Sequence, residues 1–315
     1  MKILSSLLWF TGLAELIALF LWPTVGLHAF WNVLIPAAPA LFAVAPGVWR
    51  NICPLGTTGQ LPRKIGMSGR TELTSAQSRR LQGIGVVLLL AIVPLRHVVL
   101  NLDGPATATA MIVLALLAIG MGLKAPGKSG WCTGLCPVHP VEKLYGIKPA
   151  VHFQNHHCQP CVKCTPLCPD THSPTSHNAF VGGFAGYIYG WFQVPDWADG
   201  VGWSHLPTAY AWPLGGFLAG WLLYRLLQSL LPKENQRKQL LLAFSAAAIS
   251  CYYWFRLPAL FGYGPFPGDG MLIDLRDTLP AWFPVVTPYL TTLFFFAWFF
   301  RRAPHRTWMK PQFLL

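Results

Sequence analysis

Residues 105–123 read PATATAMIVLALLAIGMGL, a stretch that contains no charged side chain. About 20 apolar residues in a helix cross the roughly 30 Å hydrocarbon core of a bilayer, so this stretch predicts a transmembrane helix. Further stretches share its apolar character, at 4–22, 28–48, 81–100, 178–194, 207–231, 239–258 and 282–300. The stretch at 178–194 is short and rich in glycine, which also fits a re-entrant or interfacial segment. We therefore predict an all-α polytopic membrane protein with six to eight transmembrane helices.

The composition of the whole chain supports a membrane protein and excludes other classes. Of the 315 residues, 53% are hydrophobic and 11% are charged, whereas roughly 25% of the residues in soluble domains are charged. Apolar runs of this length exclude a pair of soluble domains, a disordered chain, a coiled coil and a small disulfide scaffold. The first run is longer than the apolar core of a signal peptide, so we expect a retained helix.

The charged residues predict the orientation of the helices. The net charge is +12, but the basic residues gather in short loops, which favours membrane topology over nucleic-acid binding. With the N-terminus in the cytoplasm, every Lys and Arg except Arg96, Arg256 and Arg276 falls toward the inner side, as the positive-inside rule requires. We expect a multi-pass protein of a bacterial-type inner (cytoplasmic) membrane. It contacts the lipid bilayer and no nucleic acid, and its N-terminus and cysteine-rich loops are cytoplasmic.

One inner segment carries a cysteine pattern with a known chemistry. Residues 158–170 read CQPCVKCTPLCPD, in which Cys158, Cys161, Cys164 and Cys168 follow the C-x2-C-x2-C-x3-C-P spacing of bacterial ferredoxins. Thiolates at this spacing wrap one face of an iron–sulfur cube, and the loop amides stabilise its reduced state. We predict that the four cysteines bind a [4Fe-4S] cluster in a cytoplasmic ferredoxin-like iron–sulfur loop. They would also suit a zinc ion, although zinc loops usually consist of two separated C-x2-C pairs.

Three more cysteines lie in the inner loops. Cys53 in RNICPLG, and Cys132 and Cys136 in GWCTGLCPVHP, are candidates for a second cluster, for the fourth ligand of the first cluster, or for other redox thiols. Both Cys53 and Cys136 precede proline. Aligning the two Cys-Pro segments places Trp49 opposite Cys132 and suggests a duplicated helix pair. Cys251 falls within the seventh apolar stretch, and its role is left open.

Together these loops resemble the membrane-bound ferredoxin-type [4Fe-4S] protein family over residues 28–170. The family includes ferredoxin-type quinol dehydrogenase subunits of periplasmic nitrate reduction, ferredoxin-type proteins of methylamine utilisation, regulatory proteins of nitrous oxide respiration and copper-reducing assembly factors of cytochrome oxidase. Its usual form has two C-x3-C-P motifs and often two ferredoxin runs. This chain has Trp49 at the leading position of the first motif, and a single run. The resemblance implies electron transport, with quinol as a donor.

Polar residues in or near the predicted spans are further candidates. His28, His97 and His205 fall near outer helix ends, where two facing imidazoles could bind a b-type haem. Arg96 and His97 could instead hydrogen-bond a quinone, and all three histidines could simply be interfacial. Glu15 lies inside the first span, where an ionisable side chain suggests function. It could carry protons, or pair with Arg96 and fix the helix packing.

We divide the chain into a four-helix membrane region at 1–123, a cytoplasmic iron–sulfur segment at 124–177 and a C-terminal membrane region at 178–315. The predicted function is membrane-bound electron transfer through at least one [4Fe-4S] cluster, between the quinol pool or a cytoplasmic donor and a partner redox protein in or on the membrane. The chain would then be an electron-transfer subunit rather than a stand-alone enzyme. The alternatives are an assembly or maturation factor that supplies electrons for metal insertion in a partner, and a zinc-stapled membrane scaffold.

The cluster prediction has a direct test. Replacing Cys158, Cys161 or Cys164 by serine should abolish the electron paramagnetic resonance signal of the dithionite-reduced cluster, because the thiolates hold the iron. An intact [4Fe-4S] spectrum in all three variants would contradict the prediction.

Overall fold

The computed structural model describes residues 2–69, 71, 73–125, 128, 130–151, 178–196, 202–266 and 270–301. Within these ranges the regular structure is helical and contains no strand, which confirms the predicted all-α class. The α-helices are α1 (Lys2–Leu21), α2 (Pro23–His28), α3 (Ile35–Val44), α4 (Pro46–Ile52), α5 (Pro54–Thr58), α6 (Leu61–Lys64), α7 (Ser75–Leu95), α8 (Gly104–Lys124), α9 (His139–Tyr145), α10 (Asn178–Trp191), α11 (Leu206–Leu230), α12 (Glu234–Leu260) and α13 (Phe283–Arg301). The π-helical segments are η1 (Ala29–Leu34), η2 (Arg96–Leu100) and η3 (Trp131–Leu135), and η5 (Trp203–His205) is a 3-10 turn.

In the described part of the chain, five continuous helices are long and apolar enough to cross a membrane. They are Pro23–Val44 (α2, η1 and α3), Ser75–Leu100 (α7 and η2), Gly104–Lys124 (α8), Glu234–Leu260 (α12) and Phe283–Arg301 (α13). Each coincides with a predicted span, which supports a multi-pass membrane protein. The other three predicted spans are helical as α1, α10 and α11, but they do not reach the same combination of length and apolarity. Six to eight crossings therefore stay a prediction.

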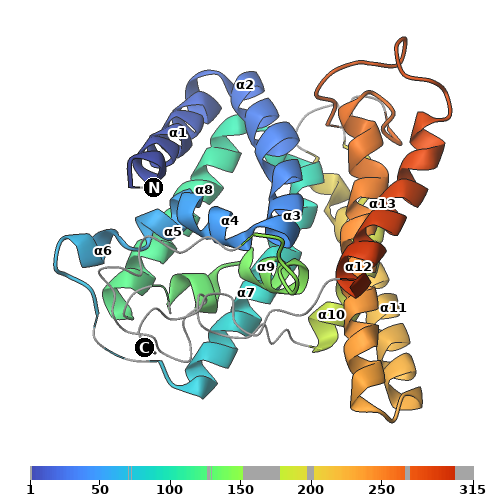
Figure 1. Cartoon of the computed structure of the whole chain (residues 1–315). Helices are drawn as coiled ribbons and strands as arrows, with labels where there is room; N and C mark the ends of the chain where they lie inside the picture. The colour runs from blue at the N-terminus through green and yellow to red at the C-terminus, as the bar shows by residue number, and fades with distance from the viewer. Residues whose placement is uncertain are drawn as a thin grey trace.

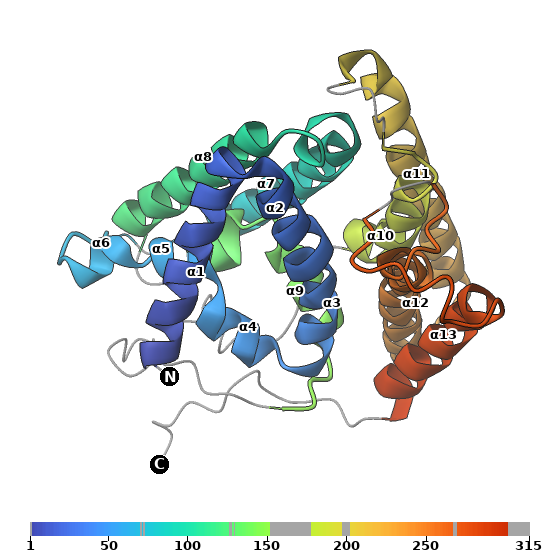
Figure 2. The same cartoon turned by 90° about the horizontal axis from the view of Figure 1, so that it is seen from above.

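The helices form two groups that pack side by side. In Figure 1 and Figure 2, α1 to α9 lie on one side and α10 to α13 on the other. The short helices α4, α5 and α9 lie among α1, α3, α7 and α8 and contact them. The first group therefore surrounds the chain segments that join α4 to α5 and η3 to α9, which are the two Cys-Pro turns.

Tyrosine hydroxyls connect the two groups where proline interrupts a helix. Pro94 in α7 has no N–H to donate to the carbonyl oxygen of Leu90. The Tyr187 hydroxyl of α10 donates to that oxygen at 3.0 Å. One residue further along α7, the Tyr210 hydroxyl of α11 donates to the carbonyl oxygen of Ala91 at 2.5 Å. Since lipid offers no hydrogen bonds, a backbone carbonyl in a spanning helix must find its donor within the protein.

A third tyrosine enters the backbone of α3. In a regular helix the amide of Ala40 would donate to the carbonyl oxygen of Pro36. Here the Tyr253 hydroxyl of α12 lies between them, because it accepts from the amide at 3.0 Å and donates to the oxygen at 2.8 Å. The same ring stacks on Phe295 of α13, with 5.6 Å between the ring centroids. Tyr253 therefore fixes α3 against both α12 and α13.

Glycines bring α10 and α11 into backbone contact. A methyl group on Gly186 would lie 2.0 Å from the carbonyl oxygen of Gly216, and a methyl group on Gly216 would lie 2.1 Å from that of Gly186. One turn away on either side, Gly182 packs on the ring of Tyr224 and Gly190 on the backbone of Trp212. Small residues four apart are typical of helix pairs in membranes, where close van der Waals packing drives association. The glycine content of α10 is thus explained by its partner helix.

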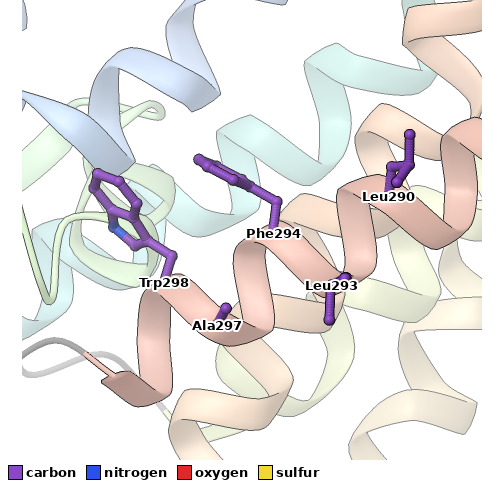
Figure 3. Close-up of a pocket in the computed structure, with 5 residues that line it drawn as sticks. All are labelled: Leu290, Leu293, Phe294, Ala297 and Trp298. Atoms are coloured by element: carbon purple, nitrogen blue, oxygen red, sulfur yellow. The ribbon is translucent and has the colours of Figure 1, made fainter.

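The outer face of α13 is apolar and exposed. Figure 3 shows a shallow hollow on it that is lined by Leu290, Leu293, Phe294, Ala297 and Trp298. A face of this composition on a candidate spanning helix is what contact with lipid acyl chains requires.

The contact between α10 and α11 predicts a difference between two neighbouring glycines. Gly216→Val should destabilise the protein by about 1–3 kcal/mol, because backbone atoms cannot move aside for the new side chain. Gly215→Val is the matched control, since a methyl group there meets no atom within 4 Å. Thermal unfolding of both variants in detergent measures the difference. Equal midpoints would show that the two helices do not pack as described.

Candidate functional site

The two Cys-Pro turns have nearly the same backbone conformation. Cys53 separates α4 from α5 with φ −57° and ψ 115°, and Cys136 follows η3 with φ −60° and ψ 121°. In both turns proline disfavours a helical conformation of the preceding cysteine, so one helix ends and a new direction begins. The structure thus supports the internal repeat that the sequence suggests, with Trp49 in α4 at the place that Cys132 has in η3.

Each turn directs backbone amides at its own cysteine sulfur. The amide of Gly56 donates to Cys53 Sγ at 3.4 Å. The corresponding amide in the second turn, that of His139, hydrogen-bonds Cys136. Such bonds lower the pKa of a thiol, because they stabilise the negative charge of the thiolate. The same donors would stabilise the sulfurs of an iron–sulfur cluster.

The third inner-loop cysteine joins this site. A methyl group built on Gly56 would lie 3.7 Å from Cys132 Sγ and 3.8 Å from Cys53 Sγ, so both sulfurs border the same small space. Cys136 is close enough to Cys132 and Cys53 for their charges to raise its pKa. Three thiols from two distant segments, all predicted as ligands or redox groups, therefore come together beneath α1 and α8.

Partial burial favours the protonated forms of Cys53 and Cys136. It raises the pKa of Cys53, and it raises that of Cys136 well above the usual range, an effect that the neighbouring cysteines strengthen. Lys128 acts in the opposite direction on Cys53, because its positive charge favours the thiolate. Binding of a metal centre would have to displace these protons, so its affinity would rise with pH.

A buried ionic group adjoins the thiols, and sequence reasoning missed it. Arg50 Nε donates to Glu142 Oε1 at 2.5 Å, and the side chains are 6% and 8% exposed. His139 Nδ1 lies 3.5 Å from Glu142 Oε2, which is too long for a good hydrogen bond. Burial lowers the pKa of His139 to about 4, so the imidazole is neutral. The signal in the sequence was CPVH, which places a histidine three residues after Cys136.

The donor chemistry fits a soft metal or an iron–sulfur centre, although the geometry is not that of a single ion. Thiolate sulfur with imidazole nitrogen is a donor set for such centres. In the ranges that the structure describes, no three His, Cys, Asp or Glu side chains are arranged to hold a metal ion. The predicted cluster ligands Cys158, Cys161, Cys164 and Cys168 lie outside the described residues.

The end of the first group at η2 holds a second polar cluster. His97 Nδ1 lies 2.5 Å from Asp196 Oδ1 and its Nε2 lies 3.1 Å from the carbonyl oxygen of Trp191. Asn101 donates to the other carboxylate oxygen at 2.8 Å. Burial alone would raise the pKa of Asp196, but His97, Asn101 and Arg96 together hold it below its usual range. Both nitrogens of His97 are engaged, so binding of haem iron there would require breaking one of these contacts.

The Arg96 side chain of this cluster is also occupied. Its guanidinium lies 4.0 Å from the ring centroid of Trp31 and 4.7 Å from that of Trp191, a cation–π arrangement on two indoles. His28 instead lies 3.1 Å from the Asn32 side-chain nitrogen. His205 is exposed at the start of α11. The quinone and haem contacts suggested for these residues stay predictions.

Glu15 makes no ion pair with Arg96. Its Oε1 is buried and has no hydrogen-bond partner among the described residues. Three residues earlier, Gly12 packs on Pro54, since a methyl group there would lie 2.9 Å from the proline ring. Glu15 thus lies about one helical turn, roughly 5 Å along α1, from the contact with the first Cys-Pro turn. This neighbourhood is compatible with the predicted proton carrier.

The buried pair gives a stability prediction. Glu142→Gln should cost about 3–5 kcal/mol, because it leaves the Arg50 charge buried without its carboxylate. Glu234→Gln is the control, since Glu234 forms an exposed pair with Lys238 at 2.7 Å, and such pairs contribute about 0–1 kcal/mol. Thermal unfolding in detergent compares the two variants. A Glu142→Gln variant as stable as the control would contradict the buried pair.

Comparisons with protein-family models, with curated proteins and with solved structures found no match to this chain. The chemistry of the site therefore has to be argued from its own residues.

Proposed function

We propose that this protein transfers electrons in a membrane through at least one [4Fe-4S] cluster, with Cys158, Cys161, Cys164 and Cys168 as ligands. We further propose that Cys53, Cys132 and Cys136 form a second redox site, or supply a cluster ligand, in the same region. The observation that carries the proposal is the convergence of these three thiols from two separate Cys-Pro turns. A structural role alone does not explain why Cys53 and Cys132 border one small space with Cys136 close to both. Amides are directed at Cys53 and Cys136, and the charge of Lys128 acts on Cys53.

The residues around the thiols have separate tasks in this proposal. A bound cluster would supply one-electron transfer. The amides of the two turns and the ammonium of Lys128 favour added negative charge on the sulfurs and so favour the reduced state. The Arg50–Glu142 pair fixes α4 against α9 and thereby holds the two turns in register. The surrounding helices cover the sulfurs in part.

Quinol is the donor that we propose, with a partner redox protein as acceptor. Oxidation of a quinol releases protons together with electrons, so it needs a proton acceptor near the redox site. Glu15 is the candidate, because it is a half-buried carboxyl on the helix that packs against the Cys53-Pro54 turn.

An assembly factor that supplies electrons for metal insertion in a partner is the second candidate. It is favoured by the shared space between Cys53 and Cys132, because paired thiols suit soft metal ions. In this alternative, loss of Cys132 and Cys136 abolishes metal loading of the partner and leaves the [4Fe-4S] cluster intact. A zinc-stapled scaffold is separated from both candidates by the identity of the bound metal.

The deciding experiment is anaerobic purification, followed by iron, sulfide and zinc analysis and by electron paramagnetic resonance before and after dithionite. About four iron and four sulfide per chain with a reduced-cluster signal indicate a single-cluster carrier, and about eight of each indicate a second cluster at the Cys-Pro turns. Zinc without sulfide would overturn the electron-transfer proposal.

Serine variants locate the second site. Cys53→Ser, Cys132→Ser and Cys136→Ser should each change the iron content or the signal of the reduced protein. Cys251→Ser is the matched control, because Cys251 is a buried thiol within α12. If all four variants resemble the wild type, the three thiols have no redox or ligand role.

A further inference from the structure

A small loop after α6 presents apolar side chains beside basic ones. Ile65 and Met67 have exposed fractions of 68% and 62%. Between them Gly66 adopts φ +77°, which other residues rarely adopt, so the chain turns sharply at this point. Arg63 and Lys64 directly precede the turn, at the end of α6. We refer to residues 63–67 as the basic-apolar tip.

Contacts with α8 fix the position of this tip along the axis of that helix. The amide of Gly69 and the hydroxyl of Ser68 both donate to the carbonyl oxygen of Gly122 at 3.3 Å. A methyl group on Gly69 would lie 2.2 Å from the carbonyl oxygen of Lys124, so the loop approaches the last turn of α8 as closely as a backbone can. Figure 1 and Figure 2 show α6 at the edge of the molecule beside this end of α8. Because α8 is a candidate spanning helix that ends at Lys124, the tip lies at the level of the lipid headgroups.

The basic residues at this level have no acidic partner in the described part of the chain. The ion pairs found there involve other residues: Arg50 with Glu142, His97 with Asp196, His139 with Glu142, Lys238 with Glu234, and Arg276 with Asp274. The unpaired cations are Arg63, Lys64, Arg79, Arg80 and Lys124, at the ends of α6, α7 and α8. Their charge favours an anionic ligand at the membrane surface.

We propose that the basic-apolar tip binds anionic phospholipid headgroups on the cytoplasmic surface, with Ile65 and Met67 inserted among the lipids. Basic side chains near an anionic leaflet and apolar side chains buried at its boundary add their contributions in this kind of binding. Insertion among lipids explains why Ile65 and Met67 are exposed instead of packed inside the protein. This interaction is independent of the redox proposal, because the tip shares no residue with the cysteine site.

The test uses the full-length protein in detergent and native mass spectrometry with phosphatidylglycerol or phosphatidylcholine as the probe. The Arg63→Gln/Lys64→Gln variant should bind phosphatidylglycerol about 25-fold more weakly, from about fivefold for each basic side chain. The Ile65→Ser/Met67→Ser variant should also bind more weakly, although its charge is unchanged. Lys233→Gln/Lys238→Gln is the matched control, with the same loss of charge between α11 and α12, where Lys238 already pairs with Glu234.

The proposal is supported if both tip variants lose the preference for phosphatidylglycerol and the control variant keeps it. An equal loss in the control would show that total charge, and not the tip, attracts the lipid. Unchanged lipid binding in the tip variants would also overturn the proposal. If those variants then lost binding of polyglutamate, the tip would be a docking site for an acidic protein. Lys64, Ile65 and Met67 are exposed and Arg63 is partly exposed, and size-exclusion chromatography checks that the variants fold.

Discussion

In lipid, each backbone carbonyl needs a hydrogen-bond donor from the protein itself, and this requirement shapes how the two groups of helices pack. Pro94 removes the donor that the carbonyl of Leu90 would normally have, whereas in α3 a helix bond is opened although its amide is present. Tyr187 supplies the missing donor to Leu90, and Tyr253 lies between the amide of Ala40 and the carbonyl of Pro36. These tyrosines belong to α10 and α12, whereas the carbonyls belong to α7 and α3. A carbonyl that lacks its helix donor in one group of helices is thus hydrogen-bonded by a tyrosine of the other group. These hydrogen bonds hold the two groups together.

Proline has a second use in the two Cys-Pro turns. It stops one short helix and leaves the cysteine in an extended conformation, with the following amides directed at the sulfur. The repeat of this turn brings sulfurs from two segments together, and the Arg50–Glu142 pair holds the segments in place. Helix packing around the turns then covers the thiols in part. The proposed redox site depends on these three features together: the turns, their convergence and the packing around them.

The two ends of the first helix group differ in character. At the η2 end, Arg96, His97 and Asp196 form a closed cluster in which each group has partners, so it ties η2 to the segment after α10. At the end with the Cys-Pro turns, partly buried thiols and a neutral His139 coexist with cations at the ends of α6, α7 and α8. Chemistry and lipid contact are therefore both expected at the end with the Cys-Pro turns, and structural cohesion at the η2 end.

The sequence by itself determined the helical class and the positions of the five long apolar helices, which are among the eight spans predicted, because apolar length is a local property. It also predicted the equivalence of the two Cys-Pro turns, since proline acts on its own neighbour. Only the tertiary structure decided that Cys53 and Cys132 share one space, that Arg50 pairs with Glu142, and that His97 uses both ring nitrogens. Those facts depend on how segments up to about a hundred residues apart pack, and no local pattern encodes that packing. The glycines of α10 illustrate the difference, because they suggested a weak span until Gly216 of α11 gave them a partner.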